Sequence, residues 1–494
     1  MRKWGPEIIV FTAGFVIMAF ELAGSRILGP YVGTSVFVWS SLIGLVMGAL
    51  SLGYAVGGRL SVKATDMKTL AWILSFAAIF IILTATGNDK VMKKLKWLIS
   101  DFRWLSLIAT TLLFTPASFF LGMVLPYTAR LKIPEIGSSG AAVGNIYAAS
   151  TIGSIAGTFA GGFLLIPLVG FKSLMIFLAL ILLLMAIVLM LAEKGYLIAS
   201  MPFVIAIIAF LFLWDKGKEK DYLDRDTAYN RVIVYDSEDE KSGRPVRILK
   251  VNDETSSAMY LDGKGLVFEV LKYYRLAGHF NPDFENALMI GGSGYAFPND
   301  FIGKYPHATL DVVEIDPGLT RIARKYFGLK DHPRMNIFHQ DGRIYLNRTK
   351  KKYDVIYMDA YKSLLTIPYQ LTTLEAVREM HDRLTTDGVV LANVISTMDP
   401  SNNYFLRAEL ATYREVFPRV LLFAVRDPED TELLQNFMIV GLKSSLKVPL
   451  ESDDPELQKY LSHIVTLDIP SDLPVLTDEY APVDFYTNKL LKDL

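Results

Sequence analysis

A glycine-rich run and an acid in the second half of the chain have the spacing of a nucleoside-binding site. The run ALMIGGSGYAFPNDFIGKYPHATLDVVEID, residues 287–316, predicts a strand, a glycine loop, a helix, a second strand and then a carboxylate. Glycines let the backbone approach a bound nucleoside, and the acid after the second strand accepts its ribose hydroxyls. Glu314 stands 22 residues after Gly292, close to the roughly 20 of this motif. We therefore assign Gly291, Gly292 and Gly294 to the ligand's backbone contacts and Glu314 to the ribose.

Two further acids follow the next two predicted strands. Asp341 lies in FHQDGR after the third strand, and Asp359 lies in YDVIYMDAY at the end of the fourth. A doubly wound sheet binds its ligand outside the carboxyl ends of its strands, where these acids would join Glu314. We assign Asp341, with Gly342, to the adenine amino group and Asp359 to the reacting centre. Aspartate before glycine is also ordinary turn chemistry, which is the structural alternative for Asp341.

Alternating strand and helix patterns predict the sheet that would position these acids. Residues 229–265 contain RVIVYDS, RPVRILKVND and SSAMYLDG, which predict a small antiparallel β subdomain. Residues 266–494 predict a Rossmann-like, methyltransferase-type α/β domain. Its last two strands lack a clear helix between them, so we expect an antiparallel edge pair, typical of nucleoside-dependent transferases rather than dehydrogenases. The expected strands are 286–291, 309–314, 335–339, 354–358, 388–394, 420–425 and 436–441.

The first 214 residues are far more apolar than the rest. The mean hydropathy of +0.32 and the 52% of hydrophobic residues are too high for a wholly soluble chain. We predict an α-helical transmembrane bundle over 1–214, a charged linker over 215–228, and the α/β part after it. Runs that can cross roughly 30 Å of hydrocarbon predict about seven spans. These are 7–28, 36–57, 69–86, 104–125, 141–166, 172–192 and 196–214.

The orientation of these spans does not follow from lysine and arginine, because basic residues lie on both sides. Nucleoside cofactors are made in the cytosol, so we expect the soluble domain in the cytoplasm and, with seven spans, the N-terminus outside. The lysine-rich segment KVMKKLKWLI predicts, as an alternative to a loop, an amphipathic helix on the membrane surface. The chain is thus expected to be a multi-pass protein of the cell membrane, with the lipid bilayer as a partner.

Glu21 is an acid inside a predicted span. A carboxylate there is costly and suggests a function such as binding a cation or a headgroup. The alternative is an ion pair with Arg26 or Arg59 near one end of the span. The glycines of GALSLGYAVGGRL and GSIAGTFAGGF predict close helix packing rather than a ligand site.

Several classes of site are disfavoured by composition. The chain has no cysteine, which excludes disulfides, thiolate metal sites and a cysteine nucleophile. Its six histidines show no ligand-like spacing, so we expect no metal. A net charge of −1 leaves no basic excess for phosphates, so we expect no nucleic acid partner.

Several of these motifs together resemble a known family. GGSG, VVEIDP, DGR, YDVIYMDAY and LTDEYAPVD are similar to the spermidine and spermine synthases, the polyamine aminopropyltransferases, and in particular to the branch fused to a polytopic membrane domain. The membrane half resembles that branch in FELAGSRILGPYVGTSVFVWSSLIGLVMGALSLGYAVGGRL and GNIYAASTIGSIAGTFAGGFLLIPLVG. The resemblance implies transfer of an aminopropyl group from decarboxylated S-adenosylmethionine to an amine, with release of methylthioadenosine and no metal. A homodimer is possible.

The resemblance also implies roles for individual residues. Asp359 matches the acid that orients and deprotonates the attacking nitrogen, and burial would give such an acid a raised pKa. Tyr274 matches a tyrosine that flanks the amine. Asn230 stands where the family usually has a glutamine that contacts the nucleoside. Tyr361 and Tyr480 are candidates to line the acceptor pocket, and the acids of LTDEY are candidates to bind a polyamine.

Three positions depart from the family pattern. Gly294 replaces an acid of the glycine loop, Arg275 replaces a histidine, and Lys362 stands near the place of a second acid. Fewer carboxylates and two more cations disfavour a polycation. Arg275 or Lys362 could instead pair with the carboxylate of intact S-adenosylmethionine. The alternatives are therefore a methyltransferase acting on an amine or a membrane-borne acceptor, and a transporter or sensor with a nucleoside-binding regulatory domain.

Overall fold

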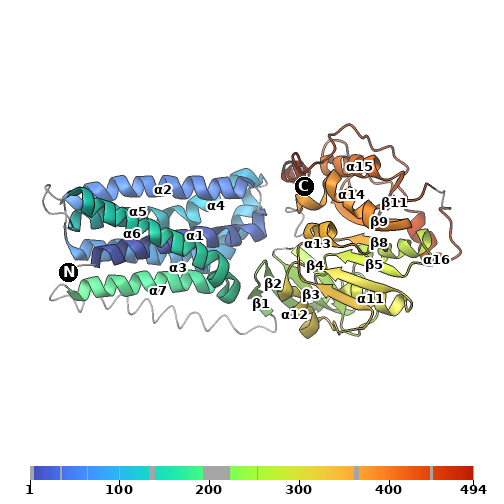
Figure 1. The fold of residues 1–494 in the computed structure, drawn as a ribbon, viewed down its shortest axis with the longest axis horizontal. Helices are drawn as coiled ribbons and strands as arrows, with labels where there is room; N and C mark the ends of the chain where they lie inside the picture. Colours follow the sequence, from blue (N-terminus) through green and yellow to red (C-terminus); the bar gives the residue numbers. More distant parts are fainter. Residues whose placement is uncertain are drawn as a thin grey trace. The chain divides into compact units, whose positions relative to one another are not determined.

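The computed structural model describes residues 5–33, 36–63, 65–99, 101–132, 139–192, 223–252, 254–360, 367–445 and 449–492 (Figure 1). The chain forms two compact units, Met1–Asp221 and Tyr222–Leu494. The predicted seventh span, 196–214, and residues 215–222 of the predicted linker lie outside the described residues.

The first unit is a bundle of long apolar helices. Among the described residues, five helices are long and apolar enough to cross a membrane, or six spans result if α4 and α5, which meet at a 51° bend, form one span. α1 contacts every other helix described in the unit, so it is the central one. The elements are α1 (Gly5–Val32), α2 (Val36–Lys63), α3 (Met67–Leu98), α4 (Phe102–Leu113), α5 (Thr115–Lys132), α6 (Ser139–Phe159), the π-helix η2 (Ala160–Leu165) and α7 (Ile166–Ala192).

The lysine-rich segment near residues 90–96 is not a separate surface helix. It continues α3, which runs unbroken for 32 residues. The alternative of an independent amphipathic helix is therefore wrong, because α3 continues through Gly87 and Asn88 without a break.

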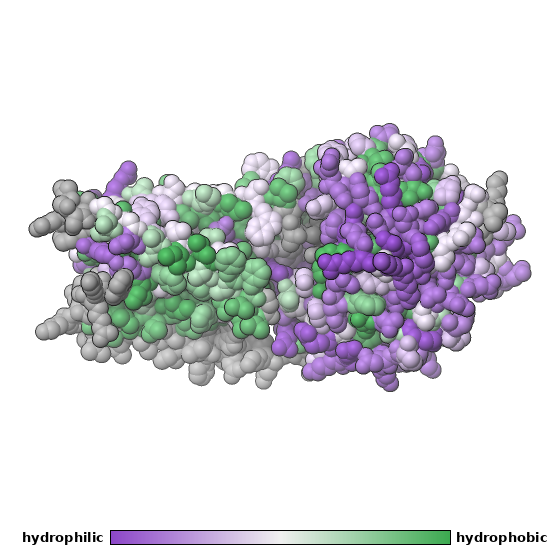
Figure 2. All heavy atoms as spheres, in the orientation of Figure 1, coloured by the Kyte–Doolittle hydropathy of each residue, from purple (hydrophilic) through white to green (hydrophobic). Residues whose placement is uncertain are grey.

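Glycines bring the helices close together, as the sequence predicted. A Cβ atom on Gly153 would lie 2.0 Å from the carbonyl oxygen of Phe11, and one on Gly157 would lie 2.2 Å from that of Phe15. Gly53 meets the backbone of α5 in the same way. Only the absence of a side chain allows these contacts between helix backbones. On the face that Figure 2 shows, the described part of the bundle is largely hydrophobic, whereas the second unit is mainly hydrophilic.

The second unit begins with a four-stranded antiparallel sheet. Its strands are β1 (Leu223–Asp226), β2 (Arg231–Glu238), β3 (Pro245–Val251) and β4 (Glu254–Tyr260), in that order. β1 lies inside the segment predicted as linker, because its sequence, LDRD, is charged. The strand pairs with β2 at the edge of the sheet, where Arg231 forms an ion pair with Asp224 at 2.8 Å.

A seven-stranded sheet forms the body of the second unit. Its order is β10-β11-β9-β8-β5-β6-β7; β5 to β9 are parallel, and β11 runs antiparallel to both neighbours. Every predicted strand is present, and so is the antiparallel edge pair. The strands are β5 (Asn286–Ile290), β6 (Thr309–Val313), β7 (Met335–Phe338), β8 (Tyr353–Met358), β9 (Leu384–Ser396), β10 (Arg419–Ala424) and β11 (Gln435–Leu442).

Helices cover both faces of this sheet. Ala287 and Met289 of β5 join one hydrophobic core, and Leu288 and Ile290 join the other, as period-two alternation requires. The first core includes α11 (Ala296–Lys304) and α12 (Pro317–Tyr326); the second includes α13 (Gly342–Arg348), α14 (Leu374–Arg383) and α15 (Tyr404–Val416). The remaining helices are α9 (Glu269–Tyr273), η3 (Tyr274–Leu276), α10 (Ala277–Phe280), η4 (Tyr369–Leu371), α16 (Pro455–Leu461) and α17 (Val483–Lys492).

Candidate active site

The glycine loop between β5 and α11 lies against the end of β8. Gly291 has φ +100°, and a Cβ atom there would lie 2.1 Å from the carbonyl oxygen of Asp359. Ser293 and Tyr295 also have positive φ, 45° and 57°. Non-glycine residues rarely adopt this conformation, which clusters at functional sites. The loop is therefore held in a strained conformation next to Asp359.

Glu314 follows β6 and holds this loop. Its Oε2 atom accepts hydrogen bonds from the backbone N–H groups of Gly292 and Ser293, both at 2.9 Å, and its Oε1 accepts one from Asp316 at 2.9 Å. The side chain is only 5% exposed. Burial raises the pKa of the Glu314 carboxyl, while the backbone hydrogen bonds favour its charged form.

Asp359 follows β8 and is held by an amide side chain. Asn393 of β9 donates from Nδ2 to Oδ1 of Asp359 at 3.0 Å, and Asn436 of β11 donates to Oδ1 of Asn393 at 2.9 Å. Burial raises the pKa of the Asp359 carboxyl, against the hydrogen bonds from Asn393 and Tyr274. Neither asparagine was predicted from the sequence. An amide side chain within an otherwise apolar strand, as in VVLANVIS, could have indicated a polar contact there.

Tyr274 lies beside this acid, as its predicted role requires. It is fully buried, and its ring centroid lies 5.0 Å from that of Phe297 and 5.2 Å from that of Tyr357. Its hydroxyl also reaches the carbonyl oxygen of Met358 at 3.5 Å. The structure thus brings together Tyr274, Asp359 and the glycine loop.

Gly294 has no room for a side chain. A Cβ atom there would lie 2.5 Å from Oγ and 2.7 Å from Cβ of Ser257, which belongs to β4. Next to it, the hydroxyl groups of Ser256 and Ser293 are 2.7 Å apart. Neutral hydroxyl groups of the small sheet therefore occupy the space where an acid of the loop would extend.

Asp341 begins α13 as its N-cap. Its Oδ1 accepts a hydrogen bond from the N–H of Ile344 at 3.1 Å, which is the structural role considered from the sequence. Its Oδ2 lies 3.4 Å from Nε2 of Gln370. Gly342 packs against Ile290, whose Cγ2 would lie 2.5 Å from a Cβ atom at this position. The predicted adenine contact of Asp341 stays a prediction.

Asn230 is buried at the junction of the small sheet and α12. It donates to Oδ2 of Asp316, the N-cap of α12, at 2.9 Å, and Thr227 binds the same oxygen. Asp316 immediately follows the acidic end of β6. The contact with Asp316 fixes Asn230 near Glu314, and its predicted contact with the nucleoside stays a prediction.

Arg275 is paired with two acids. Its guanidinium binds Asp300 of α11 at 3.0 Å and forms a second ion pair with Glu456 of α16. The predicted acceptor role of Arg275 stays a prediction. The pairing with Glu456 could not be read from the sequence, because that acid lies 181 residues away.

The other acceptor candidates are only partly described. Tyr361 and Lys362 lie outside the described residues. Tyr480 is 56% exposed. Asp478 is bound by Arg343 of α13 at 2.8 Å and by the hydroxyl of Thr373 at 2.6 Å, so it ties the C-terminal segment to α13 and α14.

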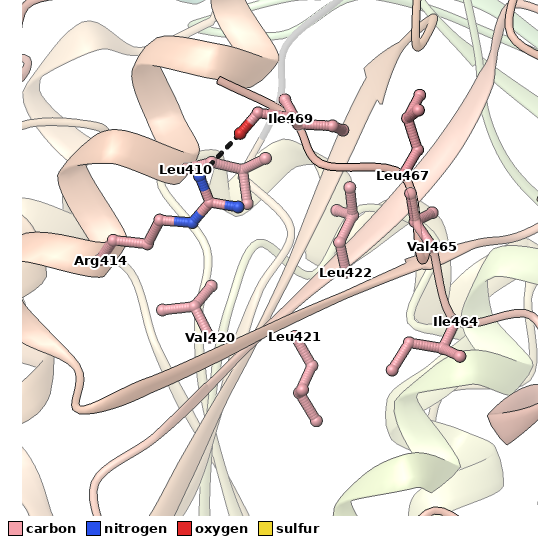
Figure 3. A pocket seen from close by; sticks show the side chains of 9 residues that line it. All are labelled: Leu410, Arg414, Val420, Leu421, Leu422, Ile464, Val465, Leu467 and Ile469. Atoms are coloured by element: carbon pink, nitrogen blue, oxygen red, sulfur yellow. Dashed lines mark hydrogen bonds between the residues drawn. The ribbon is translucent and has the colours of Figure 1, made fainter. Parts of the chain in front are cut away.

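A small pocket lies elsewhere, on the β10 edge of the sheet (Figure 3). Its volume is about 90 Å³, well below the roughly 300–1,000 Å³ of a typical ligand site. Arg414 closes one side by donating to the carbonyl oxygen of Ile469 at 2.9 Å. The lining residues are Leu410, Arg414, Val420, Leu421, Leu422, Ile464, Val465, Leu467 and Ile469. No group of three metal-ligating side chains occurs in the described parts of the chain.

The order of the seven strands, with its reversed β11, defines a Rossmann-like domain of the methyltransferase type. Residues 272–448 match the family model of the spermine/spermidine synthase domain. The C-terminal part of the chain is therefore a domain of this family, and the enzyme is a transferase of the aminopropyltransferase type. The resemblance predicted from the motifs is confirmed.

Two curated relatives agree with this result. The polyamine aminopropyltransferase of Vibrio vulnificus is 27% identical over 282 residues, which cover 53% of this chain and 89% of that protein. Polyamine aminopropyltransferase 2 of Aquifex aeolicus is 22% identical over 412 residues, 79% of each chain. Among solved structures, a probable spermidine synthase from Corynebacterium glutamicum has a TM-score of 0.40 and 23% identity, and covers 48% of this chain and 86% of that one.

Proposed function

We propose that this protein is a membrane-anchored enzyme that transfers the aminopropyl group of decarboxylated S-adenosylmethionine to an amine and releases methylthioadenosine. The observation that carries the proposal is the half-buried carboxyl of Asp359, placed between the glycine loop and Asn393 at the carboxyl end of β8. Parallel strands present their ligands at this edge.

The reaction needs a base and good alignment. The amine nitrogen attacks the carbon next to the sulfonium, a C–N bond forms, and the C–S bond breaks to leave a neutral thioether. The nitrogen loses one proton, which Asp359 accepts. The raised pKa of this carboxyl brings it closer to the range in which a base works well. The hydroxyl of Tyr274 and the amide of Asn393 hold the carboxylate in place.

The donor would bind along the glycine loop. In this proposal the Glu314 carboxylate takes the ribose hydroxyls, Asp341 takes the adenine amino group, and the backbone of Gly291, Gly292 and Gly294 lies against the ligand. Since Glu314 already accepts two N–H groups of the loop, it keeps the loop in place before the donor arrives.

Methyl transfer from intact S-adenosylmethionine has less support. That alternative relied on Arg275 or Lys362 to pair with the donor carboxylate. Arg275 is engaged by Asp300 and Glu456, and Lys362 lies outside the described residues. The described residues of the site also give no direct support to a transporter with a regulatory domain. The acceptor is proposed to be a small amine, the soluble unit is proposed to lie in the cytoplasm, and a homodimer stays a prediction.

Calorimetric titration of the full-length protein tests the donor. We expect binding of decarboxylated S-adenosylmethionine and of methylthioadenosine, with weaker binding of the intact cofactor. Transfer to a diamine, followed by mass spectrometry, should then yield a product larger by one aminopropyl group. Binding of none of the three nucleosides would refute the enzyme proposal, and tighter binding of the intact cofactor would favour methyl transfer.

A further inference from the structure

An acid without a partner lies inside the helical unit. Glu21 is half-buried well within α1, the central helix of the bundle. It has no hydrogen bond or ion pair with any other residue that the structure describes, so the ion pair with Arg26 or Arg59 considered from the sequence is not formed. A carboxylate in an apolar span is costly and usually serves a function.

The π-helix η2 contacts α1 at the level of this acid. A Cβ atom on Gly161 of η2 would lie 3.4 Å from Cα of Ala19 and 3.6 Å from Cδ1 of Leu22, the residues that flank Glu21 within one turn. π-Helical segments are rare and frequent at functional sites. They also disturb the regular backbone hydrogen bonds, which is tolerated at membrane depth only inside protein or next to a cavity.

The break between α4 and α5 reaches the same level from another side. Phe114 stands at the 51° bend, and its ring centroid lies 5.1 Å from that of Phe20. A Cβ atom on Gly24 would lie 3.0 Å from Cε1 of Phe114. Two independent irregularities of the backbone therefore meet α1 within one turn of Glu21.

Buried hydroxyl groups without a hydrogen-bond partner surround the same break. Within the described residues, the hydroxyls of Thr110, Thr115 and Ser118 have none. Hydroxyls in helices commonly donate to the carbonyl four residues earlier, as Ser106 and Thr111 do here. Unpartnered buried hydroxyls are costly, so a group that binds them would stabilise the bundle.

Helix periodicity places one of these hydroxyls and the acid in the same seam. Val10, Leu125 and Ile146 form a small apolar cluster between α1, α5 and α6. Glu21 follows Val10 by three turns of α1, and Ser118 precedes Leu125 by two turns of α5, so each shares the face of its cluster member. Because α1 and α5 run antiparallel, Glu21 and Ser118 lie on the same side of this cluster along the seam between the helices.

We propose that Glu21, together with Ser118, binds a protonated primary amine within the helical unit. An alkylammonium group carries one positive charge and three N–H donors, and the seam offers one carboxylate and the neutral hydroxyl oxygen of Ser118. A metal ion such as calcium would need about six to eight oxygen ligands. The inference rests on the proposed function, since the ligand belongs to the amine class that the soluble unit would use.

Amine binding to the full-length protein in lipid nanodiscs tests this site. The probe is 1,4-diaminobutane, titrated into the wild type and into Glu21→Gln, with Glu7→Gln as the matched control. Glu7 lies on the same helix but forms an ion pair with Lys132. We expect Glu21→Gln to weaken one of the binding events by about tenfold or more, since a charged hydrogen bond is lost. Glu7→Gln should keep that event.

A second, milder variant is a control for misfolding of Glu21→Gln. Ser118→Ala keeps the charge and should weaken the same binding event about threefold or more. Three results would overturn the proposal. They are unchanged amine binding in Glu21→Gln, an equal loss of amine binding in Glu7→Gln, and displacement of the bound amine by sodium chloride when the ionic strength is held constant. Transfer activity separates this inference from the proposed function: if transfer fails while the Glu21-dependent event persists, only the proposed function falls.

Discussion

A carboxyl group that accepts a proton from the amine must be ionised when the reaction begins. Because burial raises the pKa of Asp359, we expect kcat/KM to fall as the pH is lowered through that raised pKa. Asp359→Asn should lower kcat by about 100-fold or more, the usual contribution of a general base. Methylthioadenosine binding, measured by calorimetry, should persist. Loss of both would place Asp359 in the donor site instead.

The same substitution should not destabilise the fold at neutral pH. The folded protein holds the proton of Asp359 more tightly than the unfolded chain does, so its stability decreases as pH rises from the unfolded pKa through the folded one. Asparagine removes the buried charge. We expect the Tm of Asp359→Asn to equal or exceed that of the wild type at pH 7, and the difference to disappear below the unfolded pKa. A clear decrease at pH 7 would contradict this account.

Gly294 and Ser257 should behave as a coupled pair. Gly294→Ala places a methyl group against Oγ of Ser257, so it should lower stability by about 1–3 kcal/mol, the usual cost of overpacking. Ser257→Gly removes the atoms that would collide and should restore most of that loss in the double variant. Chemical denaturation of the four proteins measures the coupling. Additive effects would mean that the two positions do not touch.

At this scale the sequence predicted the acids, because each follows a buried strand and glycine spacing marks the loop. It did not predict how they are held. Asn393 and Asn436 are single polar residues in apolar strands, and only the strand order shows that Asn436 meets Asn393 and that Asn393 meets Asp359. The ion pairs of Arg275 were not predicted either, since Asp300 and Glu456 lie 25 and 181 residues away in the sequence.

The strands themselves were predictable because they are buried on both faces and appear as continuous apolar runs between turn residues. β1 was not, since a charged edge strand looks like a linker. The π-helix and the bend between α4 and α5 were also missed, because hydropathy does not distinguish a straight helix from an irregular one. For the bend, Pro116 at the start of α5 was the signal in the sequence.

The two asparagines form a chain of hydrogen bonds across β11, β9 and β8. Asn436→Ala would free the amide of Asn393 to rotate, so we expect kcat to fall about tenfold while the KM for the donor stays unchanged. Asn336→Ala is a suitable control, because that amide donates to Asp311 on another part of the sheet, at 2.9 Å. Equal rate losses in the two variants would show a general effect on the sheet rather than positioning of Asp359.

At the scale of the molecule, the second unit has its own two hydrophobic cores. We therefore expect residues 216–494 to fold alone and to remain monodisperse in size-exclusion chromatography without detergent. This fragment should transfer the aminopropyl group to a water-soluble amine at a rate similar to that of the full chain. A folded but inactive fragment would mean that the helical unit completes the active site.

The absence of cysteine makes the orientation easy to measure. Lys63, at the end of α2, and Lys94, near the end of α3, are exposed and lie at opposite ends of the bundle, since α3 returns from the end at which α2 finishes. With the seven spans predicted from the sequence and the soluble unit in the cytoplasm, a membrane-impermeant maleimide should label Lys63→Cys but not Lys94→Cys in intact cells. With the same seven spans, the reverse pattern would place the soluble unit outside.

The close contact between Gly294 and Ser257 also limits how this enzyme can evolve. An acid at position 294 would not fit by one mutation, because its side chain would meet the position that Ser257 occupies. Ser257 would have to change first. We therefore expect chains that share both this glycine and this serine to keep them together and to differ at other positions of the site.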